Sequence, residues 1–202
     1  MLFHFFEPIA QFIDVEYTRS VATKDKAEPW RFDIIAVSKS LPHRVALIEL
    51  KYGSGAIGGK SGITKHIKDY YNFHSNGSYD ILLPELISII KGIDLMGVAI
   101  PDSISKHLGK EDFCECPEYY FITLDNNPDE SGNTPKMTMA GYLFGGKTWG
   151  TCKPSSKVDT DGFYAVVKDP AFRPSFKFSN AILPDLGIDN IIDSALYEEG
   201  EY

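Results

Sequence analysis

The sequence predicts an α/β fold in which a mixed sheet is flanked by helices. Two apolar runs, residues 32–37 and 45–51, are rich in branched side chains and are separated by a short connection, a pattern typical of a β-hairpin. Both faces of this hairpin are mainly apolar, so each face needs a covering layer. Helix-like and strand-like segments follow it, which indicates that helices supply those layers.

The hairpin brings two acidic residues together if its turn is centred on Leu41. Residues whose numbers sum to 82 then face each other, so Asp33 lies opposite Glu49. Lys51 shares their face because side chains alternate along a strand. A slip of one residue would put the two carboxylates on opposite faces, so the prediction depends on this register. Facing carboxylates repel each other unless a cation lies between them.

A divalent cation is the predicted cofactor. Charges in such apolar strands are costly without a function. Mg²⁺, with Mn²⁺ as a substitute, is typically held by one or two carboxylates together with water and substrate phosphate. Asp33 and Glu49 are the candidate ligands, and the Leu50 carbonyl is a third oxygen. Lys51 would orient the attacking water or neutralise charge in the transition state. The alternative is a structural ion pair between Lys51 and one carboxylate.

These residues resemble the PD-(D/E)xK nuclease superfamily, which includes restriction endonucleases, recombination exonucleases and Holliday junction resolvases. The resemblance covers residues 1–100 and implies a restriction endonuclease-like core of order αβββαβ. It places Asp33 on the second strand and Glu49-x-Lys51 on the third. The resemblance implies a magnesium-dependent endo- or exonuclease that uses a metal-activated water to cleave nucleic acid. DNA is the expected substrate. Residues 101–202 would extend the same domain with further strands.

The first helix of this superfamily often adds a Glu to the site. Glu7, in a predicted helix over residues 2–12, is the candidate for this catalytic role, and Glu16 in the following segment is its competitor. The Pro that gives the superfamily its name is absent, because Phe32 precedes Asp33.

A helix predicted over residues 62–74 supplies candidate substrate contacts, because its apolar residues recur at helical spacing. His66 and Tyr70 stand where some exonuclease-like members of the superfamily carry a Gln and, four residues later, a Tyr near the scissile phosphate. Lys65 on the same helix and Lys60 in the preceding Gly-rich loop are further candidates for phosphate contact. For each side chain, an ordinary solvated position is the alternative.

The Gly-rich loop also invites comparison with a nucleotide-binding P-loop. That motif, ending on Gly59-Lys60-Ser61, requires Gly at position 54, where this chain has Ser54. A strand at residues 120–125 that ends in Asp keeps an NTPase as an alternative. The P-loop interpretation leaves Glu49 and Lys51 without a role.

The remaining elements are predicted from their periodicity. Residues 80–91 predict a helix, and residues 95–100 predict a short buried strand that ends at Pro101. Further strands are predicted at 119–124, 137–144 and 163–167, with long loops at 125–135 and 145–162 and a short helix with an acidic tail over 188–202. The second loop combines an aromatic residue with cations, as a loop that grips a nucleic-acid strand would: Trp149, Lys147, Lys153 and Lys157.

The composition is that of an ordinary globular protein, with 202 residues, 43% of them apolar. No apolar segment approaches the roughly 18 residues that cross a bilayer, and the start lacks the basic region of a signal peptide. A cytoplasmic location without membrane contact is therefore expected. Three cysteines without paired spacings are expected to be reduced thiols: Cys114, Cys116 and Cys152.

The net charge of −8 is unevenly distributed. Residues 1–75 carry ten Lys or Arg against eight Asp or Glu, net +2, whereas residues 76–202 are net −10. A metal would neutralise two of the acidic residues in the first part, leaving a locally positive site for nucleic acid. The acidic C-terminal half suits a protein partner or a second copy of the chain. A catalytically inactive domain that binds nucleic acid or a protein is the alternative function.

Overall fold

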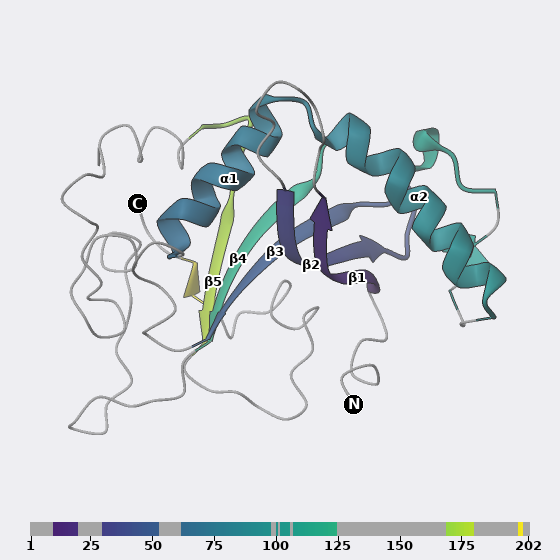
Figure 1. Cartoon of the computed structure of the whole chain (residues 1–202), viewed down its shortest axis with the longest axis horizontal. Helices are drawn as coiled ribbons and strands as arrows, with labels where there is room; N and C mark the ends of the chain where they lie inside the picture. Colours follow the sequence, from purple (N-terminus) through teal and green to yellow (C-terminus); the bar gives the residue numbers. More distant parts are fainter. Residues whose placement is uncertain are drawn as a thin grey trace. The chain divides into compact units, whose positions relative to one another are not determined.

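The computed structural model describes residues 10–19, 30–52, 62–97, 100, 102–105, 107–124, 169–179 and 198–199. Within these residues the chain is of the α/β class, as the sequence predicts (Figure 1). The chain divides into two compact units. The first comprises residues 1–48 and 72–118, and the second comprises residues 49–71 and 119–202.

The first unit contains an antiparallel meander (Figure 1). Strand β1 (Ala10–Arg19) pairs with β2 (Trp30–Ser38), which pairs with the first half of β3 (Val45–Tyr52). Four β2–β3 partners are described, and their numbers sum to 82 in every case, from Ile34 opposite Ile48 to Val37 opposite Val45. The predicted register is therefore confirmed over these pairs.

The predicted helix over residues 2–12 is wrong where the structure describes it, because residues 10–12 belong to β1. From Ile13 onwards apolar and polar residues alternate, which is the period of a half-buried strand rather than of a helix. The register with β2 shifts by one residue between Phe12 and Asp14, as a β-bulge produces. Glu16 lies on this strand, and Glu7 lies outside the described residues.

Helix α2 (Tyr79–Leu95) forms the long helical part of the first unit. It confirms the helix predicted over 80–91 and extends four residues beyond it. Its inward side chains are aliphatic, with one tyrosine: Tyr79, Leu82, Leu83, Leu86, Ile87 and Ile90. The strand predicted at 95–100 is wrong at its start, because Leu95 ends α2 and a turn follows through Gly97, whose φ of 74° suits glycine. Two shorter helices follow, α3 (Asp102–Ser105) and η2 (Lys110–Asp112).

The core of the first unit includes the strand residues of the hairpin. Every residue of β2 from Phe32 to Ser38 is buried except Asp33, which is half-buried. Phe32 and Trp30 both meet the ring of Phe73 edge-on, with centroids 5.1 and 4.9 Å apart. Such edge-to-face contacts add to the stabilisation that burial provides.

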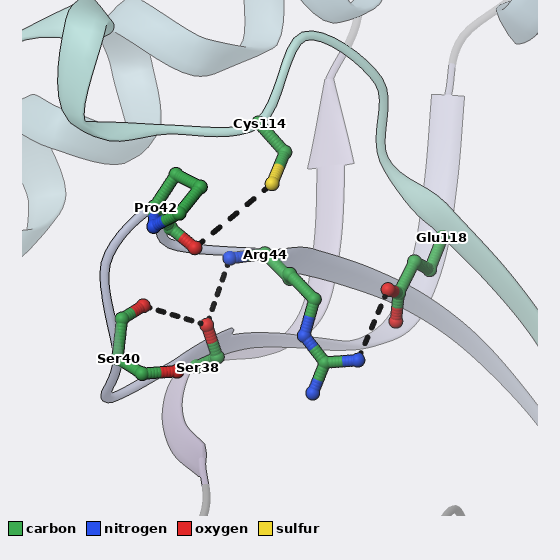
Figure 2. Close-up of polar contacts among 6 residues, drawn as sticks. All are labelled: Ser38, Ser40, Pro42, Arg44, Cys114 and Glu118. Carbon is green, nitrogen blue, oxygen red and sulfur yellow. Dashed lines mark hydrogen bonds and ion pairs between the residues drawn. The ribbon is translucent and has the colours of Figure 1, made fainter.

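Ser38 and Arg44 close the turn between β2 and β3 (Figure 2). The backbone N–H of Ser38 donates to the Arg44 carbonyl at 2.9 Å, and the N–H of Arg44 donates to Ser38 Oγ at 2.8 Å. The Ser38 hydroxyl donates in turn to the Ser40 carbonyl at 3.3 Å. At the surface, Arg44 Nη1 is 3.2 Å from Glu118 Oε1. These bonds hold the turn in one geometry.

His43 ties the same turn to the segment that follows η2. Its ring is fully buried, and Nδ1 lies 2.8 Å from the Ser38 carbonyl, so Nδ1 carries the proton. The His43 N–H donates to the Asp112 carbonyl at 2.7 Å, and its own carbonyl accepts the N–H of Cys114 at 2.9 Å. Cys114 Sγ also lies 3.9 Å from the carbonyl of Pro42 (Figure 2). The hairpin turn is thus anchored to residues about seventy positions away.

The second unit contains a mixed set of strands. β4 (Glu118–Leu124) pairs in parallel with β5 (Ser175–Ser179), and β5 pairs antiparallel with β6 (Glu198–Glu199). β4 confirms the strand predicted at 119–124. The acidic tail predicted to follow the last helix is wrong at the two residues of β6, which form a strand. The strands and loops predicted between 125 and 167 lie outside the described residues.

Helix α1 (Ile63–Ser75) confirms the helix predicted over 62–74. In the second unit it buries Ile63, Ile67 and Tyr70. The Tyr70 ring lies 6.2 Å from that of Tyr119 and 5.0 Å from that of Phe121, between centroids. Within the described ranges, no helix of the chain combines the length and apolar character that crossing a membrane requires.

Candidate functional site

A buried carboxylate with a lysine and a histidine as its neighbours lies in the second unit. Glu49 and Lys51 are two positions apart on β3 and therefore share a face, and His66 lies in the first turns of α1. Glu49 is only 1% exposed. Its Oε1 is 2.6 Å from Lys51 Nζ and 3.1 Å from His66 Nδ1. The structure therefore brings three of the predicted site residues together, and we call them the Glu49 cluster.

The two carboxylate oxygens of Glu49 differ in their surroundings. Lys51 and His66 both lie within ion-pair distance of Oε1. No donor among the described residues reaches Oε2. A buried polar atom left in this state costs about 1–3 kcal/mol, and more when the group is charged. Buried atoms of this kind usually face water, an ion or a ligand. Glu49 therefore fits the carboxylate ligand of a cation.

Glu49 is ionised at neutral pH despite its burial. Burial alone would raise its pKa, because the charged form loses hydration. The closeness of His66, and then of Lys51, outweighs burial and holds the pKa of Glu49 below its ordinary value of 4.5. An anionic oxygen is therefore present in the cluster at physiological pH.

Lys51 and His66 are more exposed than the carboxylate that they contact. The side chains of Lys51 and His66 are 12% and 17% exposed, whereas that of Glu49 is 1% exposed.

The other candidate substrate contacts on α1 lie apart from this contact set. Tyr70 is 1% exposed and is packed among aromatic rings. Lys65 is exposed and forms an ion pair with Asp69 one helical turn later. Lys60 lies outside the described residues.

Two further candidate metal ligands have described positions. Asp33 is half-buried on β2 in the first unit, and its sharing of a cation with Glu49 stays a prediction. Leu50 is half-buried on β3 between Glu49 and Lys51, and its carbonyl stays a candidate ligand. The described residues contain no group of three or more His, Cys, Asp or Glu side chains placed to hold a metal ion. A cation at Glu49 would need oxygen ligands from water or substrate as well, as Mg²⁺ sites in proteins usually have.

The contact between His66 and Glu49 was not predicted from the sequence. The sequence placed His66 on a helix as a phosphate contact, because of its spacing from Tyr70. Its distance from Glu49 depends on how the start of α1 lies relative to β3, which no periodicity encodes. A histidine on the helix that directly follows an acidic strand was the only available signal.

Comparison of the chain with protein-family models, with curated proteins and with solved structures gives no match. The functional argument therefore rests on the chemistry of the Glu49 cluster.

Proposed function

We propose that the chain is a metal-dependent nuclease that hydrolyses phosphodiester bonds of nucleic acid, with DNA as the first substrate to test. The observation that supports this most is the buried, ionised Glu49, with Oε2 lacking a donor among the described residues and with Lys51 and His66 beside Oε1. A hard anionic ligand beside groups that attract phosphate is the combination such a reaction needs.

The proposal includes a restriction endonuclease-like core. The order β1, β2, β3, α1 supports it, since that is the order of the middle elements of the superfamily core. The strand at residues 10–19 pairs antiparallel with the next strand, which carries Asp33, as in the meander of that core. The initial helix of the superfamily would precede residue 10, outside the described part of the chain.

Each residue of the cluster has a distinct proposed role. Glu49 holds the cation, with Asp33 and the Leu50 carbonyl as the further ligands. A bound divalent cation supplies Lewis acidity, which polarises the phosphate and acidifies water. Lys51 faces the incoming phosphate and offsets the negative charge that grows on its oxygens in the transition state. The partly exposed His66 helps to orient the phosphate.

A cleavage assay tests the proposal. Plasmid DNA, single-stranded DNA and RNA are incubated with the full chain in Mg²⁺, in Mn²⁺ and in chelator. We expect cleavage only with a divalent cation, and a loss of at least about 100-fold in Glu49→Gln and Lys51→Met. Lys68→Met is the matched control, because Lys68 is an exposed lysine on α1 outside the cluster. Circular dichroism shows whether each variant is folded.

Two results would contradict the proposal. The first is the absence of metal-dependent cleavage of all three nucleic acids by the wild-type chain. The second is cleavage by folded Glu49→Gln at the wild-type rate. Binding of nucleic acid without cleavage would instead support the catalytically inactive, nucleic-acid-binding alternative.

A further inference from the structure

We propose that Cys114 and Cys116 form a thiol redox site, in which the two thiols close a reversible disulfide by exchange with a small-molecule disulfide and the Tyr79 phenol stabilises the reacting thiolate. All three residues belong to the first unit, whereas Glu49 belongs to the second. The inference therefore goes beyond the proposed function and does not depend on it.

The two cysteines are close enough along the chain to be joined. Both are free thiols in the structure, and Cys114 is half-buried whereas Cys116 is exposed. Residues two positions apart are separated by at most about 7 Å in a fully extended chain. Disulfides join residues whose Cα atoms lie about 4.4–6.8 Å apart. The chain bends at Glu115 and Cys116, so this pair lies within the extended limit and suits a disulfide.

Cys114 is held by the hairpin turn, and Cys116 is open to solvent. The Cys114 N–H donates to the His43 carbonyl at 2.9 Å, and Cys114 Sγ lies 3.9 Å from the carbonyl of Pro42, as Figure 2 shows. The contact with Pro42 suits the protonated thiol, because only that form has a hydrogen to donate. Cys116 is therefore the thiol that a reagent from solvent reaches first.

The Tyr79 hydroxyl is a buried donor near both thiols. Tyr79 is the first residue of α2 and is 7% exposed, and its hydroxyl has no hydrogen-bond partner among the described residues. Burial raises the pKa of Tyr79 above its ordinary value of 10.0, and the negative charges that Cys114, Cys116 and Asp80 carry when ionised raise it further. The phenol therefore stays protonated. Buried polar groups usually have a partner, and a thiolate formed at either cysteine would supply one.

The exchange conserves atoms and electrons in two steps. The Cys116 thiolate attacks one sulfur of the small-molecule disulfide, whose S–S bond breaks, and the released thiolate takes up the proton that Cys116 lost. The Cys114 thiolate then attacks Cys116 Sγ and displaces the second small thiol, which is protonated in the same way. The two cysteines are oxidised, and the small-molecule disulfide is reduced to two thiols. An exposed disulfide is more easily reduced than a buried one, so excess small thiol reopens it.

Mass spectrometry of the full chain tests the proposal. Reduced protein is incubated with oxidised glutathione, its remaining thiols are alkylated, and it is digested with trypsin. Both cysteines then lie in the peptide of residues 111–136, and Cys152 lies in a different peptide. We expect the peptide of residues 111–136 to lose two hydrogens and to carry no alkyl group. Excess reduced glutathione should restore both alkylation sites.

Cys152→Ser is the matched control, because it removes the third cysteine and leaves the pair intact. Its peptide of residues 111–136 should be oxidised as in the wild type. Cys114→Ser should instead stop at a mixed disulfide between Cys116 and glutathione. A wild-type chain that gives mixed disulfides alone or no oxidation would overturn the proposal. So would a Cys152→Ser chain that no longer loses the two hydrogens.

Tyr79→Phe tests the part assigned to the phenol. The variant keeps the ring and removes the hydroxyl, so its fold should be at least as stable as that of the wild type. Alkylation of the pair by iodoacetamide at neutral pH should slow by about fivefold, because the thiolate loses a donor. The difference should vanish in alkaline solution, where the thiols are ionised in both proteins, and the charged neighbours Asp80 and Glu115 are unchanged. Equal rates at neutral pH would overturn the role of Tyr79.

Discussion

Lys51 Nζ lies 2.6 Å from Glu49 Oε1, two residues further along the same strand. The carboxylate is almost wholly buried and the ammonium is only slightly exposed, so the pair has little water to screen it. Removal of either partner from a buried pair is costly, whereas replacement of both by neutral groups often costs little. Comparison of single and double variants therefore separates the contribution of the pair to stability from its contribution to the proposed reaction.

Lys51→Met should therefore reduce stability, because it leaves the charge of Glu49 buried with His66 as its remaining cationic neighbour. We expect the free energy of unfolding to fall by up to about 3 kcal/mol, as measured by urea denaturation. The double variant Glu49→Gln/Lys51→Met should recover part of this loss, because the buried charge is absent. A double variant less stable than Lys51→Met would show that the pair itself stabilises the fold.

The stability of the protein should depend on pH through Glu49. Its pKa is below 4.5 in the folded chain, so the unfolded chain binds a proton at higher pH than the folded chain does. The contribution of Glu49 to stability is therefore complete above 4.5 and is lost as the pH falls through the lower, folded pKa. Urea denaturation of the wild type and of Glu49→Gln from neutral to acidic pH tests this. The stability of the variant should fall less over this acidic range, and parallel curves would contradict the prediction.

Tyr70→Ala should be strongly destabilising, because the ring is buried against Tyr119 and Phe121. Truncation of a buried aromatic side chain typically costs about 3–5 kcal/mol. Tyr71→Ala is the matched control: this neighbour is half-buried and contacts Phe172, with centroids 5.5 Å apart. We expect a clearly smaller loss for Tyr71→Ala in thermal and urea denaturation. Equal losses would argue against the aromatic packing around Tyr70.

Ser38→Ala should cost about 1 kcal/mol, because the N–H of Arg44 loses its 2.8 Å bond to the hydroxyl. The exposed ion pair of Arg44 with Glu118, in the same close-up (Figure 2), should contribute less than about 1 kcal/mol in a double-mutant cycle. Both values come from urea denaturation of the wild type and four variants. These are Ser38→Ala, Arg44→Ala, Glu118→Ala and the double variant Arg44→Ala/Glu118→Ala. A coupling energy for the ion pair above the cost of Ser38→Ala would contradict this order.

The hairpin was predictable because its information is local. Branched apolar runs on both sides of Leu41, and a parity that puts charged residues on one face, specified the register that four described pairs confirm. Helix α1 was predictable for the same reason, since its buried residues recur every three or four positions.

The errors arise where a local pattern was ambiguous. The helix over residues 2–12 was expected from the resemblance, whose core begins with a helix, but residues 10–12 belong to β1. The apolar Leu95 and Met96 suggested the start of a buried strand, but both are exposed where α2 ends. β5 was missed although Phe176 and Phe178 alternate with polar residues, which is the pattern of a strand.

The candidate site was predictable in its residue types and only partly in its contacts. Strand period placed Lys51 beside Glu49, and the structure has the two in contact. The position of His66 beside the same oxygen requires tertiary packing of α1, which lies beyond any periodicity. The burial of Tyr70 follows from that packing as well.

The anchoring of His43 to residues 112–114 has a practical consequence for protein engineering. Surface hairpin turns are usually the favoured places to open a chain for circular permutation or to insert a reporter domain. Here new termini at residues 39–44 would release a buried imidazole together with its backbone partners. Tags, split sites and permuted ends should therefore be placed elsewhere in this chain.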